Sequence, residues 1–287
     1  MTLSTTTTSS RFFTRLRRPL LKRNVALSSW KVISNVAVGR TFTTNSNTDD
    51  NDGNSNSTKP PFDMAYSPVN AFQMNQYVIA CTTTRHAAIV DCGVSTKQEL
   101  AIYLEWISTK QYKLTAIWQT HAHLDHVAGL GLLTSSTEED YSNIPIYVHE
   151  RERNIYNNFA LRCKEFGFDV ENQTLPGEEM INFFDDSLTQ ISLGELTFDI
   201  LSTPGHSPGH VGFLESKYTK SFFGGDFIMQ GSIGRTDFPT SNHAEMENSL
   251  ERFVKDQDDN TIIYPGHGPP TVLKQEKQTN PFLRKYV

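Results

Sequence analysis

Four side chains that can bind a metal ion lie within six residues near the middle of the chain. They are His121, His123, Asp125 and His126, and they directly follow the apolar run 114–118. Residues two apart in an extended segment point to the same face, so His121 and His123 can contact one ion. Asp125 and His126 then turn toward a neighbouring position. The spacing therefore predicts two metal ions held side by side.

Three later segments supply further ligands, and each is a turn of small residues that follows a β-rich run. The first contains His206, the second contains Asp226 and the third contains His267. Together with residues 120–126 they resemble the metallo-β-lactamase superfamily, whose pattern is His-x-His-x-Asp-His followed by a separated His, an Asp and a last His. All seven positions of that pattern are present.

The resemblance implies how the ligands divide between two ions: three histidines hold one, a mixed set holds the other, and one carboxylate bridges them. The three histidines are His121, His123 and His206. The mixed set is Asp125, His126 and His267, and the bridging carboxylate is Asp226. The four remaining histidines match no ligand position and are predicted to be turn, surface or packing residues: His86, His149, His210 and His243.

The chemistry of such a centre explains these residue types. Zinc accepts imidazole nitrogen and carboxylate oxygen, and iron or manganese can replace it. Two ions about 3.5–4 Å apart can share a water whose pKa falls toward about 7, so that hydroxide attacks a carbonyl carbon at neutral pH. Asp125 and Asp226 are the candidates for assisting proton movement. Asp91, at the end of a predicted strand, looks like the family's carboxylate that orients the ligand loop; the alternative is a turn cap before the next helix.

The two ends of this 287-residue chain differ in composition. Residues 1–48 contain no Asp or Glu and carry eight basic side chains among many Ser and Thr, which is typical of a mitochondrial transit peptide and predicts the matrix as the destination. The alternatives are a plastid transit peptide or a basic arm for nucleic acid or lipid. Residues 49–61 are predicted to be a disordered linker, and residues 62–287 the catalytic domain.

The composition of the remaining chain excludes some functions. After residue 48 there are 18 basic and 32 acidic side chains, a formal net charge of −14, which disfavours binding to nucleic acid. No apolar run is long enough to cross a membrane. Three cysteines, Cys81, Cys92 and Cys163, show neither metal nor disulfide spacing and are predicted to be reduced thiols. No feature of the sequence indicates an oligomeric state.

The order of predicted elements fits one αββα domain, in which two sheets pack together between outer helices. Strands are predicted at 76–81, 87–91, 114–119, 144–148, 189–192, 196–202, 211–215, 221–224 and 261–264. Helices are predicted at 97–110, from residue 125 or 126 to 134, at 150–164 and at 243–255. In the family fold this arrangement brings every ligand-bearing turn to one edge.

Two further segments, 231–238 and 279–283, resemble the small glyoxalase II-type hydrolases. The resemblance implies hydrolysis of an S-2-hydroxyacylglutathione thioester, such as S-D-lactoylglutathione, to glutathione and a hydroxy acid. Larger members of that family contact glutathione through a C-terminal helical domain, whereas 20 residues follow His267 here.

Substrate contacts are predicted at two places. One is Arg235, which could instead form a structural ion pair beneath Asp226. The other is a set of side chains on the 150–164 helix that could meet glutathione carboxylates, or could form a solvated helix face: Arg151, Arg153, Arg162, Lys164 and Tyr156.

The main rival within the superfamily is the persulfide dioxygenase, a mitochondrial enzyme that uses a single iron and oxygen on glutathione persulfide. It shares the 234–238 segment, but it typically carries Ala and Asp around the last His, where this chain has Gly266 and Gly268. This difference favours the dinuclear hydrolases. A third hypothesis is a non-catalytic scaffold domain, and the intact ligand set argues against it.

Overall fold

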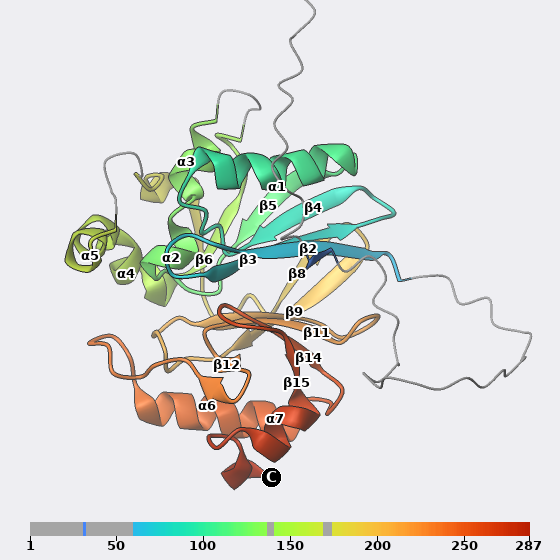
Figure 1. The fold of residues 1–287 in the computed structure, drawn as a ribbon, viewed down its shortest axis with the longest axis vertical. Coiled ribbons are helices and arrows are strands. Elements are labelled where there is room, and N and C mark those ends of the chain that lie inside the picture. The colour runs from blue at the N-terminus through green and yellow to red at the C-terminus, as the bar shows by residue number, and fades with distance from the viewer. Residues whose placement is uncertain (1–30, 33–59, 137–140, 169–173) are drawn as a thin grey trace, which may run out of the picture.

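The computed structural model describes residues 31–32, 60–136, 141–168 and 174–287, which form two β-sheets between layers of helices (Figure 1). The αββα sandwich predicted from the sequence is confirmed. Apart from residues 31–32 and 60–61, the predicted transit peptide and linker lie outside the described residues. Within the described part, no helix has both the length and the apolar character needed to cross a membrane.

The first sheet has seven strands in the order β1-β2-β3-β4-β5-β6-β7. Strands β1 to β4 are antiparallel neighbours, and β4 to β7 run parallel. The bounds of its strands are β1 (Lys31–Val32), β2 (Phe62–Val69), β3 (Met74–Cys81), β4 (His86–Val90), β5 (Lys113–Trp118), β6 (Ile146–His149) and β7 (Ile181–Phe184). The helices that pack on it are α1 (Lys97–Thr109), α2 (Leu124–Val127), α3 (Leu130–Thr134), α4 (Arg153–Asn157) and α5 (Phe159–Phe166).

The second sheet has six strands in the order β15-β14-β11-β10-β9-β8, and two helices cover its outer face (Figure 1). Its strands are β8 (Gln190–Leu193), β9 (Leu196–Ser202), β10 (Val211–Glu215), β11 (Ser221–Gly225), β14 (Ile262–Pro265) and β15 (Thr271–Val272). The helices are α6 (His243–Asp256) and α7 (Leu273–Thr279), and a small hairpin joins β12 (Ile228–Met229) to β13 (Ser232–Ile233). The described residues also include the 3-10 turns η2 (Glu150–Glu152), η3 (Glu178–Met180) and η4 (Arg284–Tyr286).

Aromatic side chains fill the space between the two sheets. The buried Trp118 ring of β5 lies 5.0 Å from the ring of Phe198 and 5.4 Å from that of Phe213, both on the second sheet. Tyr77 of β3 contacts Phe223 of β11 edge to face at 5.3 Å. Such pairs add about 0.5–1.5 kcal/mol each beyond the burial of their apolar area. This packing fixes the two sheets relative to each other, and with them the loops at their common edge.

Most predicted elements are present within a few residues, but two predicted helices are interrupted. The helix expected to run to residue 134 is divided into α2 and α3, because the Gly129 amide donates to the Cys92 carbonyl at 2.8 Å. A Cβ at Gly129 would lie 2.4 Å from Val94, so only glycine permits this approach. The predicted 150–164 helix is divided into η2, α4 and α5, with the break at Asn158. Strands β1, β2, β7, β12, β13 and β15 and helix α7 were not predicted.

Candidate metal centre

The predicted metal ligands follow strands that end at the same edge of the sandwich. Residues 120–126 follow β5 of the first sheet. In the second sheet β9, β11 and β14 point in one direction, since β9 and β11 are both antiparallel to β10 and β14 is parallel to β11. The turns after these strands carry His206, Asp226 and His267. Strand direction therefore brings all seven candidates together.

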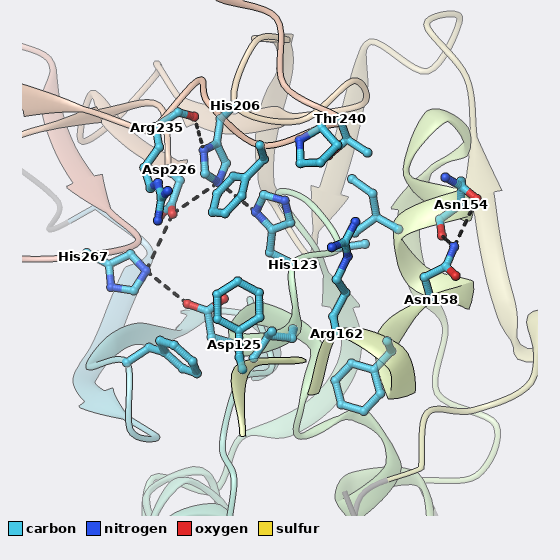
Figure 2. A pocket seen from close by; sticks show the side chains of 18 of the residues that line it. His123, Asp125, Asn154, Asn158, Arg162, His206, Asp226, Arg235, Thr240 and His267 are labelled. Carbon is cyan, nitrogen blue, oxygen red and sulfur yellow. Dashed lines mark hydrogen bonds and ion pairs between the residues drawn. The ribbon is translucent and has the colours of Figure 1, made fainter. Parts of the chain in front are cut away.

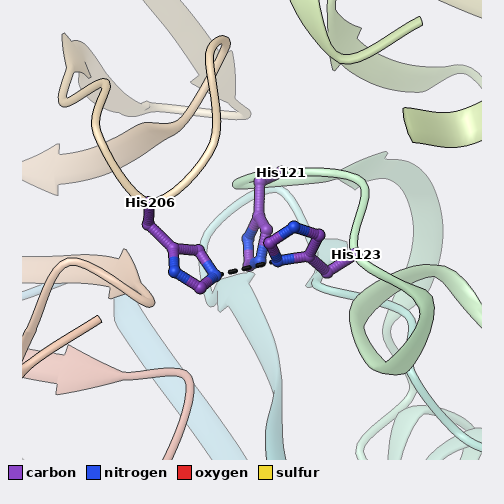
Figure 3. Close-up of side chains that lie close together, drawn as sticks. All are labelled: His121, His123 and His206. Carbon is purple, nitrogen blue, oxygen red and sulfur yellow. Dashed lines mark hydrogen bonds between the residues drawn. The ribbon is translucent and has the colours of Figure 1, made fainter. Parts of the chain in front are cut away.

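The first group of donors is formed by three histidines. The ring nitrogens of His121, His123 and His206 lie within 4.8 Å of one another, and they converge on one point in Figure 3. Nδ1 of His123 is 2.8 Å from Nε2 of His206. His121 and His206 are buried, and His123 is half-buried. This is the set that the sequence resemblance assigns to one metal ion.

The second group combines Asp125, His126 and His267, whose donor atoms also lie within 4.8 Å of one another. Oδ2 of Asp125 is 3.1 Å from Nε2 of His267 and 3.7 Å from Nε2 of His126. The Asp226 carboxylate lies between the two groups (Figure 2): Oδ1 is 3.5 Å from Nε2 of His126, and Oδ2 is 3.4 Å from Nε2 of His206. Asp226 is therefore placed to bridge two ions.

The donors fit divalent ions by two further criteria. Ligands about 2.0–2.2 Å from a tetrahedral zinc ion lie roughly 3.3–3.6 Å from one another, and most separations in the second group and around Asp226 are close to this spacing. Three inward-facing atoms are also buried without a hydrogen-bond partner among the described residues: Nε2 of His121, Nε2 of His126 and Oδ1 of Asp226. Each such atom costs about 1–3 kcal/mol unless it finds a partner, and an ion would supply one.

The charges around the centre suit a cation. Burial and the neighbouring His206 lower the pKa of His123 to about 3, so its ring is neutral and able to bind a metal. Burial alone would lower the pKa of His126, but the carboxylates of Asp125 and then Asp226 raise it well above its ordinary value. Burial would likewise raise the pKa of Asp226, yet His126 and the other histidines hold it well below its usual range. The second half of the centre therefore favours a positive charge.

Asp91 fixes both ends of the ligand loop, in agreement with the orienting role expected from the resemblance. Its carboxylate accepts hydrogen bonds from Thr120 N at 2.7 Å and from Thr120 Oγ1 at 2.8 Å, and it lies 3.0 Å from Nδ1 of His126. An ionised carboxylate only accepts, so Nδ1 of His126 carries a hydrogen and a neutral ring leaves Nε2 free for a metal. The alternative role as a helix cap is wrong, because Thr96 caps α1.

Two other ligands are oriented in the same way through their outer nitrogens. Nδ1 of His121 is 3.0 Å from Thr120 Oγ1, which already donates to Asp91 and therefore accepts from the ring. Nδ1 of His206 donates to the Arg235 carbonyl at 2.8 Å. In each case Nε2 is left to face the centre.

His210 supports the centre without belonging to either donor group. It is fully buried, its Nε2 accepts a hydrogen bond from Asp226 N at 3.1 Å, and its Nδ1 lies 2.8 Å from Thr203 Oγ1. The sequence predicted only a turn, surface or packing role for it. The available signal was the second Pro-Gly-His-like turn, 208–210, directly before a strand.

Three of the predicted substrate contacts are not placed at the pocket by the structure, and other segments engage their side chains. Arg151 pairs with Asp186, and Arg153 pairs with Glu178 and stacks over Phe183. The buried Tyr156 hydroxyl donates to the Pro176 carbonyl at 2.8 Å. None of the three lines the pocket above the metal ligands. That pocket has a volume of about 370 Å³.

Two predicted arginines do line this pocket, Arg162 on α5 and Arg235 (Figure 2). Arg235 donates to both carboxylate oxygens of Asp237, at 2.8 and 2.9 Å, and lies 4.3 Å from the Phe238 ring centre. Its ion pair is therefore exposed at the rim and does not lie beneath Asp226. Arg162 donates to Glu165 at 2.8 Å. The other pocket walls are mostly apolar: Phe72, Leu124, Ile155, Phe159, Phe166, Met229, Ile233 and Phe238.

We expect Asp91→Asn to weaken metal binding in the second group of donors. An amide nitrogen facing Nδ1 of His126 would favour the opposite tautomer, with the hydrogen on Nε2, where the metal must bind. Affinity for the second ion should fall about 10- to 100-fold in zinc competition against a chelator. The control is Asp63→Asn, which alters a buried carboxylate bonded to Tyr112 and distant from the ligands. Unchanged binding of both ions by Asp91→Asn would contradict this account of the contact.

Comparison with known proteins agrees with the fold and the ligand pattern. The family model of the Metallo-beta-lactamase superfamily matches residues 69–267. The hydroxyacylglutathione hydrolase GloC of Haemophilus influenzae is 32% identical over 217 residues, which cover 75% of this chain and 95% of GloC. Two crystal structures, those of the B3 metallo-beta-lactamase BLEG-1 and of TTHA1623 in a di-iron-bound form, are each 29% identical to this chain with a TM-score of 0.63. The BLEG-1 alignment covers 77% of this chain and the TTHA1623 alignment 76%, and each covers 99% of the other protein. The chain therefore belongs to the metallo-beta-lactamase superfamily.

Proposed function

We propose that the protein is a metal-dependent hydrolase that cleaves an S-2-hydroxyacylglutathione thioester, such as S-D-lactoylglutathione. The observation that carries this proposal is a full set of donors for two ions, with Asp226 within reach of both groups. The identity with GloC supports the class of substrate. Zinc is the expected metal because all donors are imidazoles or carboxylates; iron, as in TTHA1623, is the alternative.

The side chains of the centre would divide the reaction between metal binding and proton transfer. Two divalent ions held there would supply the Lewis acidity that makes water a nucleophile at neutral pH. Asp125 and Asp226 line the pocket, so their carboxylates are placed to accept a proton from the attacking water and to pass it to the departing thiolate. His210 holds the backbone amide of Asp226, which keeps that carboxylate in position.

The shape and charge of the pocket suit a glutathione thioester. Its volume of about 370 Å³ lies within the range of small-molecule sites, and the metal ligands lie on its surface. The apolar walls can contact the acyl group and the carbon chain. Arg162 and Arg235 are the pocket arginines available to the two glutathione carboxylates, if they exchange their present partners, Glu165 and Asp237.

Gly266 favours the dinuclear hydrolase over the persulfide dioxygenase. A Cβ at this position would lie 2.3 Å from Oδ1 of Asp226 and 2.8 Å from Cε1 of His126. An alanine, as the rival typically carries, would therefore push against the carboxylate that reaches both groups. The glycine leaves Asp226 the space that a bridge requires.

The decisive assay is thioester loss from S-D-lactoylglutathione by the full chain loaded with zinc or with iron. We expect turnover, and we expect His126→Ala to reduce it by about a thousandfold or more, about 4 kcal/mol in activation free energy. His126 supplies one of the three donors of the second group among the described residues, so its loss leaves two. The matched control is His243→Ala, which changes an exposed histidine on α6 and should leave the rate unchanged.

Other results would support the competing functions. If a folded, metal-filled protein leaves the thioester intact but the iron form consumes oxygen with glutathione persulfide, the protein is a dioxygenase. If neither reaction occurs, the non-catalytic scaffold becomes the leading hypothesis.

We expect Gly266→Ala to displace the Asp226 carboxylate and to reduce the zinc content from two ions toward one per chain, measured by elemental analysis after dialysis. The control is Gly177→Ala, where the three atoms nearest to a new Cβ all belong to the flexible Glu179 carboxylate. Retention of two zinc ions with full thioesterase activity in Gly266→Ala would show that the bridge does not depend on this glycine.

The proposed place of action is the mitochondrial matrix, supported by the acid-free, basic composition of residues 1–48. Those residues fused to a fluorescent protein should be imported and cleaved by isolated mitochondria, and import should fail when their arginines are replaced by glutamine. Uptake by chloroplasts instead would support the plastid alternative.

A further inference from the structure

Glu152 is a fully buried carboxylate next to the metal centre that neither donor group includes. It ends η2, directly after β6, and β6 is the parallel neighbour of β5. Since parallel strands end at the same edge, Glu152 lies beside the ligand loop that follows β5. It does not line the pocket, so its side chain is not placed to contact a substrate.

The two oxygens of Glu152 bind backbone amides from two different ligand loops. Oε2 accepts a hydrogen bond from Ala122 N at 2.9 Å, and Ala122 lies between His121 and His123. Oε1 accepts one from Gly209 N at 2.7 Å, in the turn that carries His206. One carboxylate therefore joins the two loops that supply all three histidines of the first donor group.

Two observations separate this role from ordinary helix capping. Glu152 occupies the N-cap position of α4, yet its side chain makes no capping bond to that helix. The turn at Gly209 also comes unusually near: a Cβ there would lie 3.0 Å from Cγ of Glu152 and 2.8 Å from Nδ1 of His149. The loop is held against the carboxylate at a distance that glycine alone permits.

We propose that Glu152 is a positioning residue that sets the separation of His123 from His206 and thereby the metal affinity of the first donor group. A carboxylate offers acceptors on both sides, and two N–H groups aimed at it fix the loops in one arrangement. The inference rests on the metal centre of the proposed function and not on its substrate. Metal binding can therefore be tested whether or not a thioester is cleaved.

The test is Glu152→Gln in the full chain, with cobalt(II) and zinc as probes. The amide oxygen can still accept one N–H, but the amide nitrogen faces the other donor, so one loop loses its partner. We expect the affinity of the first group to fall about 10- to 100-fold in chelator competition, and the visible absorption of bound cobalt to change.

The matched control is Glu215→Gln, because Glu215 is also fully buried and accepts backbone amides, from Tyr218 at 3.1 Å and Thr219 at 2.7 Å. It lies at the end of β10 and touches neither ligand loop, so the variant should lose stability toward denaturant while its metal affinity and cobalt spectrum stay unchanged. If Glu152→Gln behaves like this control, the role of Glu152 is only structural and the proposal is overturned.

A second variant covers the case in which Glu152→Gln does not fold. Glu152→Asp keeps the charge and both acceptors but withdraws them by one methylene group, so the folded protein should bind the first ion more weakly than the wild type does. Wild-type affinity and an unchanged cobalt spectrum in Glu152→Asp would likewise overturn the proposal.

Discussion

The ligand loop is held at both of its ends by one carboxylate, that of Asp91. It accepts hydrogen bonds from the amide and hydroxyl of Thr120 at the start of the loop and contacts His126 at its end. Asp91 has a positive φ of 57°, which is unfavourable for a residue other than glycine. The bonds it makes compensate for that conformation. Because the loop between them supplies four of the seven donors, these bonds orient more than half of the proposed ligand set.

Hydrogen bonds between the two sheets place the remaining donors relative to the ligand loop. Val211 N donates to Thr120 O at 2.9 Å, which binds the ligand loop to the start of β10. On the other side, Asn75 N donates to Gly266 O at 2.7 Å and the Asn75 side chain binds the carbonyls of Pro265 and Gly268. These contacts hold the turn that carries the last histidine against the first sheet. The donors are therefore placed by hydrogen bonds within and between the two sheets, and the aromatic core holds the sheets together.

The fold could be predicted from local patterns in the sequence, and the proposed ligands from the resemblance to a known family. Four ligands follow β5, two of them at the start of α2, and the other three lie in turns of small residues after strands of the second sheet. Strand direction then decides that these segments meet. The surroundings of the side chains that were predicted to contact a substrate could not be predicted in this way. Arg151 and Arg153 lie on a predicted helix, but their partners Asp186 and Glu178 come from segments 35 and 25 residues further along the chain. Nothing local to 150–164 indicates that these partners exist.

Strand β2 was missed for a related reason. It contains Asp63 and Pro68, which are both rare inside strands. The Asp63 carboxylate is tolerated because the Tyr112 hydroxyl, 49 residues away in sequence, donates to it at 2.8 Å.

The metal donors and part of the pocket wall come from different elements of the fold, and this has a functional consequence. Helices α4 and α5 supply apolar wall residues and Arg162 but no metal donor, and Glu152 holds the ligand loops from the turn before them. The wall residues on these two helices can therefore change without replacing a donor, which is one way in which a single fold can support different substrates around the same centre.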